Sequence, residues 1–316
     1  MDGRIICRVL TGPTASGKTD IGIRLALEEG WDIICMDSMQ IYRRMNIGTA
    51  KPTAAEMKGV PHHMIDICEP ADAYSVSAYR DAAEKLVNEL YEKKNREVLF
   101  VGGTALYLQA MMHPMAMGFV AANEQLRKEM NRIAETREGK LELHQRLKKI
   151  DPATADRLPV NDVRRVIRAI EVYESTGIPF SKQPVRERGP ESRFSWRVVS
   201  TAMDRDLLYE RINRRVTEMI ESGLKDEVAS LLKEGVPEDA QSMGGLGYKE
   251  MIPVIRGEYS LEDAVERIRT GTRHYAKRQM AFLRREDAIS YVRTDQEDAI
   301  GKIRQLLIQE EGNSEH

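Results

Sequence analysis

A glycine-rich segment near the N-terminus is the first group of residues whose types and spacing suggest a chemistry. It consists of Gly12, Pro13, Thr14, Ala15, Ser16, Gly17, Lys18 and Thr19. It follows an apolar run and precedes a segment with helical spacing, which is the order of strand, loop and helix found in a P-loop. In such a loop the backbone amides and the lysine bind a phosphate group, and the Thr19 hydroxyl can hold Mg²⁺. A chance glycine-rich turn is the alternative, and the flanking elements argue against it. A diphosphate suits this loop as well as a triphosphate does.

A second polar cluster follows the short apolar run 33–36. Asp37 comes directly after this run, and Ser38 and Gln40 lie in the same loop. Ligands of open parallel sheets bind at the carboxyl ends of the strands. Asp37 is therefore either the acidic residue that positions Mg²⁺ beside a P-loop or another group that points into the same crevice. The alternative is that Asp37 caps the turn after it.

The elements that must position these residues alternate between strand-like and helix-like patterns. Residues 5–10, 33–36 and 98–101 are expected as buried strands, with helices over 18–29 and 75–94 between them. This pattern predicts an α/β fold with a parallel sheet flanked by helices.

An inserted unit interrupts this alternation. Strand patterns are absent from 115–193, where charged helical segments are expected over 123–138, 141–149 and from 161, with a cap at Asn161 or Asp162. A strand at 194–199 returns the chain to the sheet, and two long helices are expected over 206–234 and 261–285, separated by a loop at 241–249. We therefore predict a core of 1–114 and 194–316 and an all-helical insertion of 115–193.

Composition limits the class of protein. The chain has 316 residues, 41% of them hydrophobic and 31% charged, which indicates a globular protein rather than a fibre or a disordered chain. No long apolar run or secretion signal is evident, so we expect a cytoplasmic protein that does not span a membrane. Three widely spaced cysteines do not predict a zinc site. His62 and His63 invite a metal interpretation, but a structural role is favoured because too few ligands lie near them.

The segment 261–285 is unusually basic. Seven basic residues outnumber three acidic ones, and Arg269, Arg273, Lys277 and Arg284 are spaced along one helical face. Such a face can bind nucleic-acid phosphates, or it can be a solvated helix surface. Arg164, Arg165 and Arg168, together with the glycine-rich segment 244–249, add further basic or flexible elements.

Several motifs of the chain resemble those of the tRNA dimethylallyltransferases, also called tRNA isopentenyltransferases, in the bacterial form that lacks a zinc finger. Besides the P-loop, the resemblance is carried by Asp37–Tyr42, Gly48–Pro52, Pro61–Asp66, Val101–Tyr107, Asp151–Ala155, Arg168–Val172 and Lys277–Gln279. It implies a P-loop NTPase-like fold and transfer of a dimethylallyl group from dimethylallyl diphosphate to N6 of the adenosine 3′ of the anticodon in tRNA.

The resemblance also implies roles for single residues. Asp37 matches the base, Arg215 matches an arginine on the diphosphate, with Arg214 as the alternative register, and Thr104 matches a residue near the reacting base. The P-loop then binds the diphosphate, with Mg²⁺ as cofactor on Thr19. The expected partners are dimethylallyl diphosphate and the tRNA anticodon stem-loop, with the insertion as a tRNA-binding domain of a monomer. The predicted tRNA contacts are Asp37, Ser38, Met39, Gln40, Arg164, Arg165, Arg168, Gly245, Gly247, Tyr248, Arg273, Lys277, Arg278, Gln279 and Arg284.

Three rival functions share parts of this pattern. A P-loop kinase would bind and turn over ATP, and a nucleotide-gated RNA-binding protein would lack covalent chemistry. A prenyltransferase of free adenine nucleotides would need neither the helical insertion nor the basic helix, so both segments favour a tRNA substrate.

Overall fold

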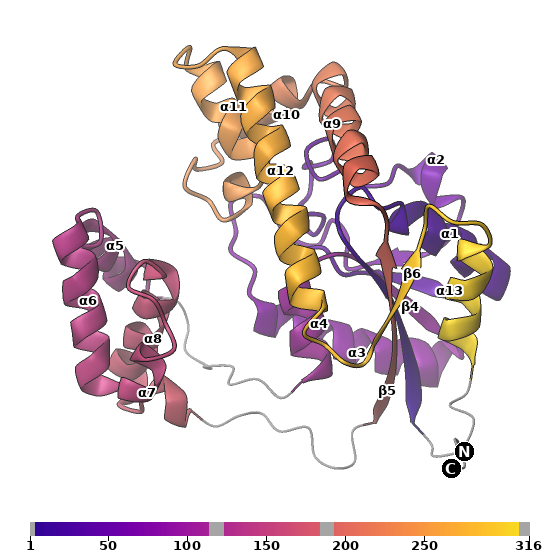
Figure 1. Cartoon of the computed structure of the whole chain (residues 1–316), viewed down its shortest axis with the longest axis horizontal. Helices are drawn as coiled ribbons and strands as arrows, with labels where there is room; N and C mark the ends of the chain where they lie inside the picture. The colour runs from indigo at the N-terminus through magenta and orange to yellow at the C-terminus, as the bar shows by residue number, and fades with distance from the viewer. Residues whose placement is uncertain (1–3, 114–122, 184–192, 310–316) are drawn as a thin grey trace. The chain divides into compact units, whose positions relative to one another are not determined.

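The computed structural model describes residues 4–113, 123–183 and 193–309, and the chain divides into two compact units (Figure 1). One unit is Met1–Met112 with Ser192–His316, and the other is His113–Glu191. No helix in the described ranges is long and apolar enough to cross a bilayer.

The first unit is built on a single six-stranded parallel sheet. Its strands are β1 (Ile5–Thr11), β2 (Asp32–Cys35), β3 (His62–His63), β4 (Val98–Val101), β5 (Phe194–Ala202) and β6 (Ile289–Arg293), in the spatial order β3-β2-β4-β1-β5-β6. The predicted α/β class with a parallel sheet is confirmed. The short strands β3 and β6 were not predicted.

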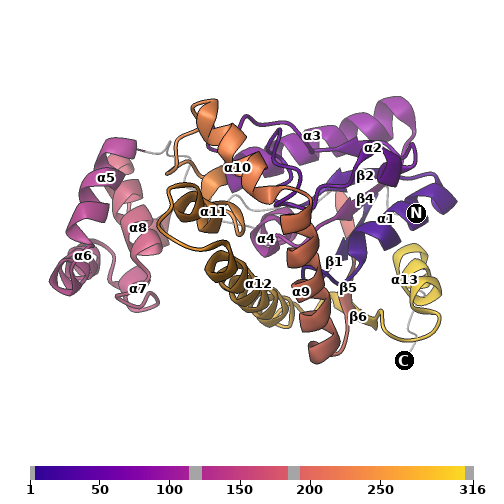
Figure 2. The same cartoon turned by 90° about the horizontal axis from the view of Figure 1, so that it is seen from above.

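Helices cover both faces of this sheet because side chains alternate along each strand. Cys7 and Val9 of β1 face α3 (Val76–Lys94) and α4 (Ala105–Met112), whereas Leu10 faces α1 (Lys18–Glu29) and α13 (Ala299–Ile308). Figure 2 shows α1 and α13 near each other. The predicted helix 18–29 is confirmed, and Ser75 caps α3 through the Ala78 amide. The sequence predicts core packing for the methionines at 111, 112, 115 and 117, and Met111 is buried as predicted. Met115 and Met117 lie outside the described ranges.

Four C-terminal helices of this unit pack together with the loop that follows β2. They are α9 (Arg205–Glu221), α10 (Leu224–Lys233), α11 (Tyr248–Ile255) and α12 (Leu261–Leu283), with the 3₁₀ turn Ser242–Gly244 before α11. Their apolar faces bury Ile41, Tyr42 and Met45. The single helix predicted over 206–234 is wrong, because Gly223 adopts φ 94° and starts a new helix. Part of the predicted loop 241–249 is also helical, since α11 begins at Tyr248.

The second unit, in its described residues, is all-helical. It contains α5 (Glu124–Ile133), α6 (Arg137–Ile150), α7 (Pro152–Ala155) and α8 (Val163–Thr176), with a 3₁₀ turn at Phe180–Lys182. The helix predicted over 123–138 is broken, because Thr136 caps a new helix through the Gly139 amide. At its centre the fully buried carboxylate of Glu171 accepts two hydrogen bonds from Arg127 and one from Arg168.

Candidate active site

The P-loop connects β1 to α1 in a conformation that leaves little room for side chains. Gly12 has φ 137°, and a Cβ there would lie 2.0 Å from the Thr201 hydroxyl of β5. Ser16 fixes the turn by donating to the Pro13 carbonyl at 2.8 Å. Gly17 adopts φ 86° at the start of α1, so the unpaired amides of the first helical turn border the loop. The backbone of these residues therefore adopts the turn that the prediction of a phosphate-binding loop requires.

The turn Gly102–Thr104 lies between the P-loop and the Asp37 loop because β4 lies between β1 and β2 in the sheet. The Gly102 amide donates to the Leu10 carbonyl at 3.2 Å, and the Thr104 amide donates to the Met36 carbonyl at 3.2 Å. A Cβ on Gly102 would lie 2.1 Å from the Met36 oxygen, so glycine is required at this close approach. The carboxyl ends of β1, β4 and β2 thus bring together the P-loop, the turn Gly102–Thr104 and the Asp37 loop.

Gln279 of α12 connects two of these segments from outside the sheet. Its Oε1 accepts the Thr14 amide at 2.9 Å, and its Nε2 donates to the Gly103 carbonyl at 2.7 Å. The side chain is 4% exposed and both ends of its amide are engaged. Gln279 therefore supports the P-loop, a role that depends on a contact no local sequence pattern reveals, and the expectation that it also contacts tRNA stays a prediction.

A cavity of about 70 Å³ lies where these segments meet. Its lining includes Lys18, Thr19, Asp37, Arg215 and Tyr275. Burial, together with the nearby Arg215 guanidinium, lowers the pKa of Lys18 to about 8. Burial also lowers the pKa of Arg215 and raises that of Tyr275. Two cations with restricted access to water are therefore placed to attract an anion.

Asp37 both caps the turn that follows it and lines the cavity beside the P-loop, which were two of the alternatives that the sequence left open. Its Oδ1 accepts the Met39 amide at 2.9 Å, so it does cap the following turn. Its Oδ2 accepts no hydrogen bond from the described residues, and the residue lines the same cavity as Lys18. The Thr104 hydroxyl accepts the adjacent Ser38 amide at 2.9 Å, which fixes the Asp37 loop against the β4 turn.

Arg215 projects from α9 to the P-loop. Its Nη1 donates to the Thr14 hydroxyl at 3.3 Å. The neighbouring Arg214 is exposed and lies 3.9 Å from Glu218. Between the two registers considered from the sequence, Arg215 is therefore the arginine that reaches the cradle.

A wider groove of about 590 Å³ continues from the outer side of the P-loop. It is bordered by α9 and by the loop at residues 46–53, and its basic side chains are Lys18, Lys51, Arg211, Arg214 and Arg215. Arg211 was missed at the level of the sequence, although its spacing of four from Arg215 on a helix places both on one face. The groove offers room for a ligand that is larger than a diphosphate.

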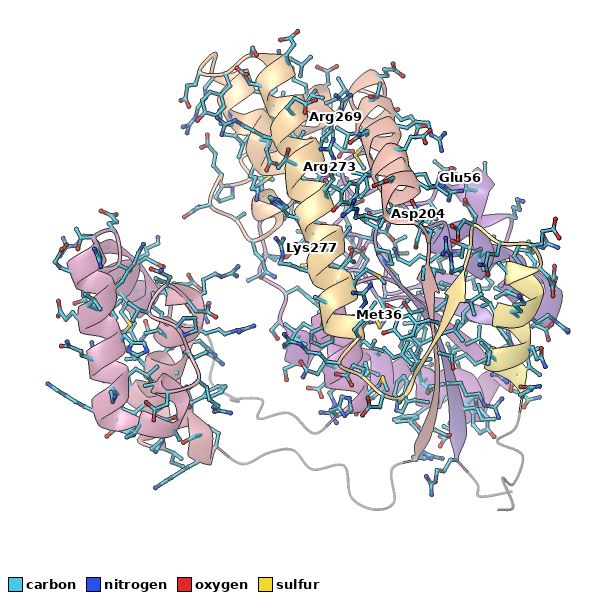
Figure 3. All side chains as sticks on the ribbon, in the orientation of Figure 1. Met36, Glu56, Asp204, Arg269, Arg273 and Lys277 are labelled. Carbon is cyan, nitrogen blue, oxygen red and sulfur yellow. The ribbon has the colours of Figure 1, made fainter. Side chains whose placement is uncertain are left out.

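The predicted basic face of α12 is divided between exposed and paired side chains. Figure 3 shows Arg269, Arg273 and Lys277 following one another along this helix. Arg269 donates to the Thr217 hydroxyl, and Arg273 donates to the Asn213 side chain at 2.7 Å, so both bind α9. Lys277 is exposed, as are the predicted contacts Arg278 and Arg284.

The other predicted tRNA contacts also separate by exposure. Gly247 and Tyr248 are buried, so the expectation that these two residues contact tRNA is corrected. Gly245 packs against Met39. In the second unit Arg164 and Arg165 are exposed, whereas Arg168 binds the buried Glu171 at 2.5 Å. Gln40 donates its side-chain amide to the carbonyls of Thr49 and Ala50, and so supports the adjacent loop.

The paired histidines have structural partners. His63 contacts Asp32 at 2.9 Å, and His62 contacts the Val60 carbonyl at 2.8 Å. Burial lowers the pKa of His62. Among the described residues no group of three or more His, Cys, Asp or Glu side chains is arranged to hold a metal ion.

Comparison with known proteins gives one consistent result. The family model described as IPP transferase matches residues 40–286. A tRNA dimethylallyltransferase of Pelotomaculum thermopropionicum is 46% identical over 287 residues, covering 91% of this chain and 90% of the relative. Another, from Caldanaerobacter subterraneus, is 40% identical over 304 residues, covering 95% and 96%.

Solved structures agree with the sequence relatives. A tRNA isopentenylpyrophosphate transferase from Bacillus halodurans superimposes with a TM-score of 0.69 at 38% identity, covering 95% of both chains. A eukaryotic dimethylallyltransferase acting on tRNA gives a TM-score of 0.71 at 25% identity, covering 92% of this chain and 74% of that one. These likenesses extend over the sheet unit and the helical unit alike.

Proposed function

Because this chain belongs to the IPP transferase family, we propose that it transfers the dimethylallyl group of dimethylallyl diphosphate to tRNA, at the exocyclic N6 of the adenosine 3′ of the anticodon. The observation that carries the proposal is the shared cavity of Lys18, Arg215 and Asp37. It combines a cradle for a diphosphate with a carboxylate, which are the two groups that this alkyl transfer requires.

The P-loop residues would bind the diphosphate and stabilise it as a leaving group. During transfer the C1–O bond of the allylic substrate breaks, and the diphosphate keeps the electron pair. Its negative charge therefore grows toward the transition state, where the loop amides, Lys18 and Arg215 stabilise it most. These cations are more effective here than in water because burial reduces screening.

The site fits a Mg²⁺ ion held largely by substrate oxygens. The Thr19 hydroxyl lines the cavity and makes no hydrogen bond with another residue in the described parts of the chain. A hydroxyl oxygen is a suitable ligand for Mg²⁺, which usually keeps few protein ligands beside phosphate. When bound, the ion would neutralise part of the diphosphate charge.

Asp37 would act as the base. The adenine N6 is a poor nucleophile because its lone pair is delocalised into the ring, so loss of its proton must accompany formation of the N6–C1 bond. The Oδ2 atom of Asp37, which has no partner among the described residues, is available for that proton. Its second oxygen is held by the Met39 amide, which keeps the carboxylate oriented.

The exposed basic residues would bind the tRNA. Positive charge is exposed on Lys277 and Arg278 of α12, on Arg284 directly after this helix, and on Arg164 and Arg165 of the helical insertion. Phosphate contacts of this kind position an RNA, while the target base must leave its stack to reach a buried site. We place this reaction in the cytoplasm. We also propose that the protein acts as a monomer.

Incubation with dimethylallyl diphosphate and unmodified tRNA, followed by mass analysis of the nucleosides, tests the proposal. We expect a prenylated adenosine that depends on Mg²⁺ and is absent with free adenine nucleotides as acceptors. Turnover of ATP without any product on tRNA would instead support a kinase.

A further inference from the structure

Residues 46–52 form a loop that follows the Asp37 segment. This loop borders both the small cavity and the outer groove. Thr49 and Pro52 line the small cavity, and Ile47, Ala50 and Lys51 line the groove beside the P-loop. The loop contains no strand and no helix before residue 54, and its own backbone bonds are the turns from Ala50 to Ile47 and from Lys51 to Asn46. Its position depends in addition on contacts from elsewhere in the chain.

One carboxylate from α10 binds the first three residues of this loop, while Gln40 binds the carbonyls of Thr49 and Ala50. The Oε2 atom of Glu227 accepts the Asn46 amide at 2.9 Å and the Ile47 amide at 2.8 Å. Its Oε1 atom accepts the Gly48 amide at 3.2 Å. Three successive backbone amides thus converge on a single side chain that lies 179 to 181 positions later in the chain.

Tyr248, the first residue of α11, completes this arrangement. Its hydroxyl donates to Oε1 of Glu227 at 2.5 Å, and its ring is fully buried. A Cβ on Gly48 would lie 2.4 Å from the same ring, so the loop backbone rests directly on the tyrosine. Burial raises the pKa of Tyr248, and the Glu227 carboxylate raises it further, so the hydroxyl stays protonated as a donor.

The strength of the hydrogen bonds to Glu227 distinguishes this contact from general packing. Hydrogen bonds from amides to an ionised carboxylate are stronger than neutral ones, at about 1.5–3 kcal/mol each. If the carboxylate is removed, three neighbouring amides need new partners at the same time. The loop would then move, and its lining of the groove would move with it.

We propose that Glu227 is a positioning residue that, together with Tyr248, holds residues 46–52 in the conformation that completes the phosphate-binding groove. The pair makes anion binding at the P-loop depend on the junction of α10 and α11. The identity of the anion as a diphosphate rests on the proposed function, but the positioning role does not require tRNA modification.

The experiment compares Glu227→Gln and Tyr248→Phe with Asp226→Asn as the matched control. Asp226 lies in the same first turn of α10 but is exposed. The measurements are amide hydrogen exchange, thermal stability, binding of inorganic pyrophosphate, and KM for dimethylallyl diphosphate against kcat.

For Glu227→Gln we expect faster exchange at the amides of residues 46–48. We also expect pyrophosphate to bind about tenfold more weakly, which corresponds to the loss of one hydrogen bond to a charged group. KM for dimethylallyl diphosphate should rise more than kcat falls. Tyr248→Phe keeps the amide contacts and should weaken binding by about two- to fivefold. Asp226→Asn should match the parent in exchange and in binding.

Parent-like pyrophosphate affinity in Glu227→Gln, with or without faster exchange, overturns the proposal. So does a loss of thermal stability with kcat and KM unchanged, since that result assigns the pair to folding alone. If Glu227→Gln does not fold, Tyr248→Phe decides, and parent affinity in that variant overturns the positioning role. Failure of the proposed function is distinguishable, because then the parent would bind pyrophosphate without modifying tRNA.

Discussion

Arg211 and Arg215 lie one turn apart on α9 and reach opposite ends of the P-loop. Arg215 donates to the Thr14 hydroxyl, near the start of the loop. The Nη1 atom of Arg211 lies 3.7 Å from the position that a Cβ would take on Gly17, at the end of the loop. Arg211 makes no hydrogen bond or ion pair within the described ranges, so its guanidinium is available to a ligand.

We expect Arg211→Ala to weaken binding of dimethylallyl diphosphate by about tenfold or more, because a hydrogen bond to a charged group contributes about 1.5–3 kcal/mol. Isothermal titration measures this effect. Arg205→Ala, which removes an exposed arginine of the same helix that lines neither the cavity nor the groove, is the matched control and should bind like the parent. Equal affinities for all three proteins would remove Arg211 from the site.

The lowered pKa of Lys18 predicts a pH dependence of substrate binding. The protonated amine attracts the diphosphate, and its pKa in the free protein is about 8. Affinity should therefore be constant below pH 8 and fall as the pH rises above it, since the proton must then be taken up on binding. Titrations with dimethylallyl diphosphate between pH 6.5 and pH 9.5, which avoid the ligand's own titration near pH ~6, measure this fall. Lys18→Ala should bind weakly and show no such change, and a flat parent profile would contradict the assignment.

Replacement of Gln279 tests whether α12 supports the P-loop. Gln279→Ala removes the partners of the Thr14 amide and the Gly103 carbonyl. Removal of each hydrogen bond costs about 0.5–1.5 kcal/mol, so the free energy of unfolding should fall by about 1–3 kcal/mol. Binding of the diphosphate should weaken as well, whereas the affinity for tRNA should remain near that of the parent. A variant that loses tRNA affinity selectively would instead support the expectation that Gln279 contacts tRNA.

Mutation of Asp37 separates its two assigned roles. As a base, Asp37 acts during bond formation, so Asp37→Ala should slow single-turnover transfer while leaving affinity for the Mg²⁺ complex of the diphosphate within a few-fold. A single-turnover assay at saturating substrates reports the chemical step. If the variant loses Mg²⁺-dependent diphosphate binding and excess Mg²⁺ restores its rate, Asp37 positions the metal and another group is the base.

The exposed cations of α12 predict a change in salt dependence. Lys277→Ala combined with Arg278→Ala should weaken tRNA binding and lower the slope of log K against log salt by about 0.7–0.9 for each RNA phosphate that the variant no longer neutralises. Arg273→Ala serves as the comparison, because its guanidinium binds Asn213. That variant should alter the slope less and the packing of α9 on α12 more. Identical slopes in parent and double variant would assign these residues to a solvated surface.

Local pattern was sufficient for much of the molecule. The P-loop, α1 and β4 were located from the sequence because each depends on neighbouring residues: glycines for the turn, apolar periodicity for the elements. The family resemblance also identified the motifs that surround the cavity. The breaks in the long C-terminal helical segment were missed, since Gly223 is tolerated in a helix pattern and becomes a break when tertiary packing favours a left-handed residue.

What the tertiary structure decided is the direction and the partner of each side chain. Gln279 and Tyr248 were both predicted at an RNA surface from their motifs, yet one supports the P-loop and the other rests under Gly48. Arg269 and Arg273 share a helical face with Lys277 but turn to α9. Helical spacing predicts which residues share a face, whereas burial of that face depends on which element packs there. Glu227 and Gly48 lie 179 positions apart, so no local sequence pattern reveals that they contact each other.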